Sequence, residues 1–203
     1  MISQINKVHQ SIKEIILKLK EDSISKKRLE ILNKILNETN KYTINKNYPN
    51  IIFICTQNSR RSQFAETWAH TFNFIFKKNI KIYSGGTSKG KLNSRTINVL
   101  KTNGFKVKKE SNKYFLNFSE NYNSVPLHSK HINELYLKDN FITIMTCSDA
   151  DKNCPVISNS LSKILLSYED PKKFDDTNQE TNKYIETSQQ IALELFYIFK
   201  NLK

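Results

Sequence analysis

The spacing of apolar residues changes near residue 50. Before that point, Asp22 and Ser23 separate two groups of apolar residues that recur three and four positions apart. Residues at that spacing share one face of a helix, so each group predicts a helix. We therefore expect a helical hairpin over residues 1–46, followed by a linker at 45–50 that contains Pro49. The two groups are Ile5, Val8, Ile12, Ile15, Ile16 and Leu19, and then Leu29, Ile31, Leu32, Ile35 and Leu36.

After residue 50, predicted strands alternate with predicted helices. The strands are IIFIC (51–55), IKIYSG (80–85), FKVKK (105–109), FITIMTC (141–147) and a weaker one at 163–167. The helices are 62–77, 94–103, 128–136 and a last one from 179, and the alternating residues 114–118 predict half of an edge hairpin. This alternation predicts an α/β fold with a central parallel sheet flanked by helices on both faces.

Composition adds limits to this prediction. The chain has 203 residues, of which 38% are apolar and 25% charged, which suits one globular domain, at 50–203, with a short N-terminal extension. No apolar run approaches the roughly 20 residues that span a bilayer. The first residues also lack the apolar segment of a secretion signal. We therefore expect a cytoplasmic protein without a membrane partner.

The formal charge of +13 raises the possibility of nucleic-acid binding. The lysines, however, are scattered from Lys7 to Lys203 and form no dense block. This distribution favours solvated helix faces that attract small oxyanions, so we expect no nucleic-acid partner. The odd number of cysteines, three, argues against a secreted disulfide framework. In a reducing compartment such thiols are catalytic, redox-active or simply buried.

The candidate chemistry begins where the predicted strand 51–55 ends on Cys55. Active sites of parallel sheets lie beyond the carboxyl ends of the strands. There, the amides of loop 56–60 and of the following helix start can converge on a tetrahedral oxyanion, and their field favours thiolate over thiol. Arg61 can grip two anion oxygens with its planar fork, and Ser62 can bond the thiolate or cap the helix. The alternative is a buried cysteine followed by a basic helix start.

Displacing an oxygen from such an anion requires a proton donor. Asp170 follows a predicted strand, and Pro171 restricts it to an extended conformation. It is therefore the candidate acid, ahead of Glu169, with a turn or helix cap as the alternative role. The residues expected to hold the anion are Thr56, Gln57, Asn58, Ser59, Arg60, Arg61 and Ser62.

The segment CTQNSRRSQFAE (55–66) resembles the phosphate-binding loop of the low-molecular-weight protein tyrosine phosphatase family, and in particular that of its thioredoxin-coupled arsenate reductases. The resemblance continues through YSGGT (83–87), CSDADKNCPV (147–156) and EDP (169–171). It leaves the N-terminal hairpin and the region 110–126 unmatched. It implies the fold predicted above, with the phosphate-binding loop after the first strand.

The resemblance also implies a reaction. Cys55 would attack arsenate while Asp170 protonates the departing oxygen, and Cys147 would then attack Cys55 and expel arsenite. Cys154 would attack Cys147 in turn, leaving a disulfide that thioredoxin or another thiol donor reduces, with no tightly bound cofactor. The alternative is a phosphatase that hydrolyses phosphate monoesters through a cysteinyl-phosphate. In that case Cys147 and Cys154 are idle or merely buried.

Several positions depart from the family pattern. Gln57 stands where the family usually has glycine, and a positive φ there would strain the backbone. Arg60 stands where these reductases often carry another cysteine, and it either assists anion capture or points to solvent. Lys172 and Lys173 follow Asp170-Pro171 where phosphotyrosine phosphatases carry aromatic residues, which weakens the prediction of a phosphotyrosine substrate.

Two residues raise the possibility of a bound cation. Asn58 and Ser84 resemble positions that help to coordinate potassium in some of these reductases. The alternative is that they hold the loop by hydrogen bonds. The four histidines show no metal-binding spacing with cysteines or acidic residues, so we expect no catalytic metal.

Overall fold

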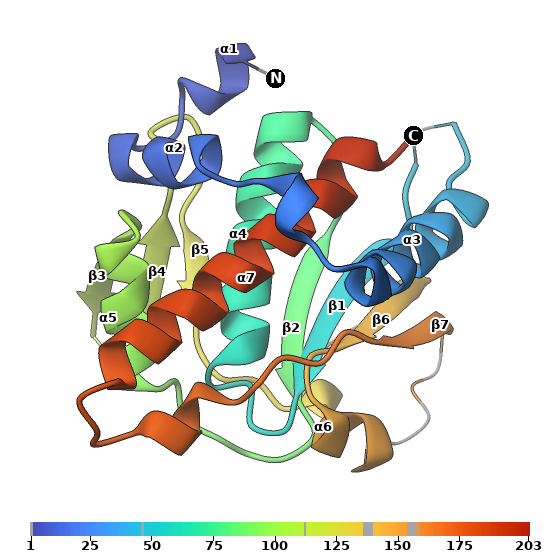
Figure 1. Ribbon diagram of the computed structural model, residues 1–203. Coiled ribbons are helices and arrows are strands. Elements are labelled where there is room, and N and C mark those ends of the chain that lie inside the picture. The colour runs from blue at the N-terminus through green and yellow to red at the C-terminus, as the bar shows by residue number, and fades with distance from the viewer. Residues whose placement is uncertain (1, 46, 112, 136–139, 154–156, 158) are drawn as a thin grey trace.

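The computed structural model of the 203-residue chain describes residues 2–45, 47–111, 113–135, 140–153, 157 and 159–203 (Figure 1). Its centre is a four-stranded sheet in the order β2-β1-β6-β7. The strands are β1 (Asn50–Cys55), β2 (Ile82–Gly86), β6 (Phe141–Met145) and β7 (Ser160–Leu165), and all neighbours are parallel. The predicted parallel sheet is confirmed, with the strand that ends on Cys55 in its interior.

Alternate residues of β1 face two different layers. Ile51 and Phe53 belong to the large core beneath α4 (Arg61–Phe76), α5 (Ser94–Thr102) and α7 (Glu180–Asn201). Ile52 and Ile54 belong to a smaller core on the opposite face. There the covering elements among the described residues are short: η2 (Ile132–Glu134) and α6 (Ser148–Asn153). Helical elements thus cover both faces as predicted, but unequally.

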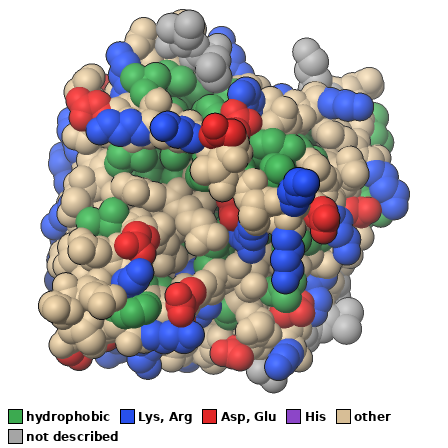
Figure 2. All heavy atoms as spheres, in the orientation of Figure 1, with side chains coloured by type: hydrophobic (Ala, Val, Ile, Leu, Met, Phe, Trp, Pro, Cys, Tyr) green, Lys and Arg blue, Asp and Glu red, His purple; other side chains and the backbone are tan. Residues whose placement is uncertain are grey.

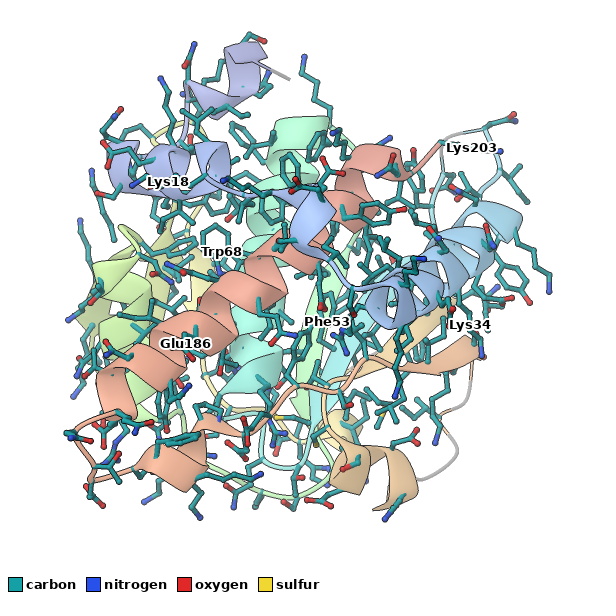
Figure 3. All side chains as sticks on the ribbon, viewed as in Figure 1. Lys18, Lys34, Phe53, Trp68, Glu186 and Lys203 are labelled. Carbon is teal, nitrogen blue, oxygen red and sulfur yellow. The ribbon has the colours of Figure 1, made fainter. Side chains whose placement is uncertain are left out.

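Trp68 is the centre of the larger core. Its side chain is fully buried between α4 and α7, where the indole nitrogen donates to Ser188 Oγ at 3.0 Å (Figure 3). Its ring stacks on Phe72 and meets Phe105 edge to face. Such close packing fixes α4, and therefore the loop that enters it, relative to α7.

The predicted N-terminal helices are present, but they do not form a hairpin. They comprise α1 (Ile2–Ile5), α2 (Gln10–Leu17), η1 (Glu21–Ser23) and α3 (Lys26–Lys41). Figure 1 shows α2 and α3 on either side of α7, with η1 crossing between them. The apolar face of each helix is buried in the main core, so the two helices pack on the catalytic region rather than on each other.

A second sheet contains the region that the family resemblance left unmatched. It is antiparallel in the order β3-β4-β5, with strands β3 (Lys106–Glu110), β4 (Lys113–Asn117) and β5 (Val125–Leu127). The predicted edge hairpin is confirmed as β3-β4, whereas β5 was not predicted. The helix expected at 128–136 is wrong for the described residues, which form only the single turn η2; residue 136 lies outside them.

The N-terminal segment is attached to this second sheet. The amide of His9 donates to the carbonyl of Phe118 at 2.9 Å, and Ser119 Oγ donates to the carbonyl of Lys7 at 2.6 Å. The two regions without counterparts in the sequence resemblance are therefore bonded to each other. Figure 2 shows Lys and Arg side chains spread over the α7 face among acidic ones, without a continuous basic block. In the part of the chain that the structure describes, no helix is long and apolar enough to cross a membrane.

Candidate active site

The loop between β1 and α4 is pressed against the end of β2. Cys55 ends β1, is only 4% exposed, and pairs in register with Gly86. A Cβ atom on Gly86 would lie 2.8 Å from the carbonyl oxygen of Thr56 and 2.9 Å from the amide of Asn58. Only glycine allows this approach of two backbones. Gly86 of the YSGGT segment thus shapes the loop that follows Cys55.

Asn58 fixes the loop from inside. It is fully buried and has a left-handed φ of 47°, a conformation that asparagine tolerates better than most residues. The positive φ that was considered at Gln57 occurs instead at Asn58, so the strain expected at Gln57 does not arise. The Asn58 amide donates to Ser62 Oγ and to Ser84 Oγ, both at 2.8 Å. Asn58 and Ser84 therefore hold the loop by hydrogen bonds, which was the alternative to coordination of a potassium ion.

Ser62 acts on the thiol and not as a helix cap. Its Oγ lies 3.0 Å from Cys55 Sγ, and α4 already begins one residue earlier, at Arg61. Because Ser62 Oγ accepts from Asn58, its own proton is free to point at the sulfur.

A second layer of polar side chains, which was not predicted from the sequence, supports Asn58. Gln63 donates to the Asn58 carbonyl at 3.0 Å and to its side-chain oxygen at 2.9 Å. Ser84 Oγ donates to Glu66 at 2.6 Å, and Glu66 pairs with Lys130 Nζ at 3.0 Å. The available signal was the pair Gln63 and Glu66 on a helix whose neighbouring residues are otherwise apolar or small.

This layer gives no support to a potassium ion. Asn58 and Ser84 bond to each other, and the charge of Glu66 is compensated by the ammonium of Lys130. Among the residues that the structure describes, no three His, Cys, Asp or Glu side chains are grouped as metal ligands.

Arg61 joins the loop to Asp170. Its Nη2 donates to Asp170 Oδ2 at 2.7 Å, and its Nη1 donates to the carbonyl of Tyr168 at 3.0 Å. The remaining donor, Nε, is buried and finds no acceptor among the described residues. Asp170 also caps η3 (Pro171–Phe174) by accepting from the Lys172 amide at 3.1 Å, so it has the cap role in addition to its place in the site.

Arg60 is part of the site and does not point to solvent. Its side chain is 11% exposed, its Nε donates to Tyr184 Oη at 3.0 Å, and its Nη1 lies 3.9 Å from Asp170 Oδ1. Tyr184 in turn donates to Asp175 at 2.8 Å. Burial and this bond raise the pKa of Tyr184 to about 12, so the phenol stays neutral beside the guanidinium.

Cys147 is the second buried thiol at the same edge. It follows β6, is 2% exposed, and its Sγ lies 3.5 Å from the Oγ1 of Thr56, the residue after Cys55. The Ala150 amide donates to the same sulfur at 3.4 Å. The residues after Cys147 form the helix α6. Cys154 lies outside the described residues.

These side chains surround a cavity of about 190 Å³. Five of the seven residues predicted to hold the anion line it, while Asn58 and Ser62 point inward to the network described above. Its described lining contains no aromatic side chain, and Asp149 and Lys172 join it unpredicted. The full lining is Cys55, Thr56, Gln57, Ser59, Arg60, Arg61, Asp149, Asp170 and Lys172. A small, polar, arginine-lined cavity suits a compact oxyanion.

Comparison with known proteins identifies the family of this chain. The chain belongs to the low molecular weight phosphotyrosine protein phosphatase family, whose sequence profile matches residues 50–164. The family resemblance inferred from the sequence is therefore confirmed, and the chain is placed in a family of enzymes that act on oxyanions. The match begins at residue 50, and the division into an extension at 1–46 and a catalytic domain at 50–203 stays a prediction.

The curated relatives include arsenate reductases. Arsenate reductase 2 of Staphylococcus epidermidis is 31% identical over 121 residues, which is 60% of this chain and 77% of that protein. Arsenate reductase of Staphylococcus aureus strain Newman is 30% identical over the same shares. Among solved structures, a YwlE mutant from Bacillus subtilis superposes with a TM-score of 0.52 at 17% identity, covering 76% of this chain and 98% of that chain. This structural similarity supports the fold.

Proposed function

We propose that the protein reduces arsenate to arsenite. The observation that carries this proposal is the second buried thiol: Cys147 meets the residue after Cys55 at the ends of adjacent parallel strands. Hydrolysis of a phosphate ester needs one nucleophilic cysteine, whereas reduction of an oxyanion needs a second thiol within reach. The relatives that are named arsenate reductases support the same assignment.

In the first step, the thiolate of Cys55 attacks arsenate held by the loop amides. Arg61 lines the cavity and binds the anion through its guanidinium group, whose Nε has no acceptor among the described residues. Asp170, which now bonds Arg61, delivers a proton to the departing oxygen, so that water leaves and an As–S bond forms. Arg60, held by Tyr184, adds positive charge on the other side of Asp170.

In the second step, the thiolate of Cys147 attacks the sulfur of Cys55. The As–S bond breaks, its electron pair stays on arsenic, and arsenite leaves as As(III). Two thiols have then become one disulfide, which balances the two electrons gained by arsenic. Cys154 attacks Cys147 and releases Cys55, which leaves a Cys147–Cys154 disulfide for an external reductant.

The reductant belongs to the same proposal. Thioredoxin is the favoured partner, and glutaredoxin or a small thiol donor are the alternatives. The described cysteines, Cys55 and Cys147, are free thiols, which suits a reducing compartment such as the cytoplasm. No tightly bound cofactor is needed, because the electrons come from cysteine sulfur.

The second candidate function is hydrolysis of phosphate monoesters. The family and the site geometry favour it, because a cysteinyl-phosphate would form by the same first step. The cavity of about 190 Å³ argues against an aryl substrate such as phosphotyrosine. Its described lining contains Lys172 and no aromatic side chain that could contact the ring.

The decisive experiment compares the two reactions in one preparation. NADPH consumption is followed with arsenate, thioredoxin and thioredoxin reductase, and p-nitrophenyl phosphate hydrolysis is measured in parallel. We expect arsenate-dependent turnover by the natural chain, one arsenite per molecule from Cys154→Ser, and none from Cys55→Ser. Absence of arsenate turnover together with brisk ester hydrolysis would replace the reductase proposal by the phosphatase one.

A further inference from the structure

Arg28, in the N-terminal extension, reaches the loop that carries Asp170. From the first turns of α3, its Nη1 donates to the carbonyl of Ser167 at 2.9 Å, and its Nε donates to Glu194 of α7 at 2.8 Å. A second bond from Nη2 to Glu194 makes the ion pair forked. Glu194 is only 2% exposed and the Arg28 side chain 19%, so this pair is partly buried and geometrically specific.

The bond to Ser167 lies one peptide from the bond that orients Arg61. The next carbonyl along the chain, that of Tyr168, accepts from Arg61 Nη1 at 3.0 Å. Asp170, two residues further, accepts from Arg61 Nη2. The short segment 167–170 is thus held by an arginine at each end: one from the extension and one from the phosphate-binding loop.

The side chain of Tyr168 completes this connection. It is 5% exposed, and the guanidinium of Arg28 lies over its ring at 5.0 Å from the centroid. Burial raises the pKa of the Tyr168 phenol well above its ordinary value, so the ring remains neutral under the cation. The backbone of Tyr168 is anchored to the sheet by its amide, which donates to Thr146 at 3.1 Å.

We infer that Arg28 is a positioning residue for the oxyanion site. It holds the backbone of residues 167–168. This backbone fixes the positions of the Arg61 guanidinium and the Asp170 carboxylate relative to Cys55. Arg28 lies outside residues 50–164, the part of the chain that matches the family profile, so the extension completes a site that the catalytic region otherwise builds. The inference rests on the proposed function only in assigning a tetrahedral oxyanion to this site.

The test measures anion binding directly. Phosphate, as the probe, protects Cys55 from iodoacetamide, and labelling of the Cys55 peptide is quantified by mass spectrometry at increasing phosphate concentrations. Arg28→Lys keeps a positive charge beside Glu194 but cannot donate to Glu194 and to Ser167 with one rigid fork. We expect the phosphate concentration for half protection to rise about fivefold to tenfold in this variant.

Two further variants separate positioning from stability. If Arg28→Lys folds poorly, the double variant Arg28→Met with Glu194→Gln replaces it. The double variant removes both charges of the pair, so neither charge is left unpaired. We expect the same weakening of phosphate protection from it. Lys200→Ala is the matched control. Lys200 of α7 forms an ion pair with Glu21 of the extension, and no contact between Lys200 and segment 167–170 is found among the described residues. Its half-protection concentration should stay within about twofold of the natural chain.

A steady-state readout adds a signature that general destabilisation does not produce. With p-nitrophenyl phosphate, we expect a higher KM and a lower kcat for the Arg28 variants, at temperatures where circular dichroism shows them folded. KM should rise because Arg61, which binds the anion, is displaced, and kcat should fall because Asp170, the proton donor, is displaced. If the folded variants keep both constants and the wild-type phosphate protection, the inference is overturned. The same holds if phosphate does not protect Cys55 in the natural chain.

The arsenate assay distinguishes this inference from the proposed function. If the natural chain reduces no arsenate while phosphate protection still weakens in the Arg28 variants, arsenate reduction fails and the positioning role stands. If arsenate turnover is normal in the natural chain and unchanged in the folded Arg28 variants, the function stands and the positioning role fails.

Discussion

Cys55 and Cys147 occupy equivalent places on neighbouring strands but very different surroundings. Both thiols follow parallel strands of the central sheet, and both are buried, at 4% and 2% exposure. Behind Cys55 stands a closed polar network, in which Ser62 bonds the sulfur and Asn58 bonds Ser62. Among the described residues, the hydrogen-bond partners of the Cys147 sulfur are the Ala150 amide and the Thr56 hydroxyl, and the six-residue helix α6 follows it directly.

The difference indicates two chemical roles. A rigid, hydrogen-bonded sulfur suits a nucleophile that must be ionised and aimed before the substrate arrives. A sulfur at the start of a short helix suits a thiol that moves after the first step, because such a helix unwinds at little cost. Burial alone does not separate the two thiols. The hydrogen bonds around them do.

Serine substitution at the two thiols should give the largest change in activity and should show most clearly whether their roles differ. Cys55→Ser should lower p-nitrophenyl phosphate hydrolysis by a factor on the order of 10³ or more, because serine is a far weaker nucleophile at this site. Cys147→Ser should hydrolyse the ester within about threefold of the natural chain but fail to turn over arsenate. Equal losses of ester hydrolysis in both variants would contradict the division of roles.

Removal of the candidate acid should have the next largest effect. Asp170→Asn keeps the shape of the side chain but cannot deliver a proton, so ester hydrolysis should fall by about 10² to 10⁴ in kcat. Glu169→Gln is the control, since Glu169 is exposed and pairs only with Lys173 at 3.0 Å among the interactions described. A large loss in Glu169→Gln and none in Asp170→Asn would exchange the roles of the two acids.

Asn58 tests the network that distinguishes Cys55. Asn58→Ala removes the amide and leaves a left-handed φ, so it should destabilise the fold by about 2–4 kcal/mol in urea denaturation. Asn58→Gly should recover about 1 kcal/mol of this, because only the backbone strain is relieved. In both variants Cys55 should react more slowly with iodoacetamide at pH 6. Asn79→Ala, at an exposed left-handed residue, is the control for strain alone, and unchanged Cys55 reactivity in all three would rule out the network.

The smallest effect concerns pH and the fold rather than either thiol. Burial lowers the pKa of His70 below its ordinary value of 6.5, so the unfolded chain binds more protons than the folded one as pH falls through that value. The free energy of unfolding should therefore decrease from pH 7.5 to 5.5, by less than about 1.4 kcal/mol per pH unit from this residue. His70→Gln should flatten part of that slope in urea titrations. A steeper slope in the variant would contradict the assigned direction.

Much of the fold was predictable, because its strongest signals are local. The apolar runs ending on Cys55 and Cys147 gave two adjacent central strands, and helical spacing gave α4, α5 and α7 to within a few residues. The predictions failed where the local sequence signal was weak. Strand β5 is three residues long and contains Pro126, and the helix α6, formed by polar residues after Cys147, was not predicted.

The sequence by itself determined the thiol at the end of a buried strand, the arginine six residues later, and the acid held by a proline. These follow from residue type and spacing along one stretch of chain. Only the tertiary structure decided that α2 and α3 separate around α7, that Asn58 carries the left-handed turn, and that Arg28 contacts the loop of Asp170. The reason is physical: these contacts join residues far apart in the chain, and their geometry depends on how whole elements pack.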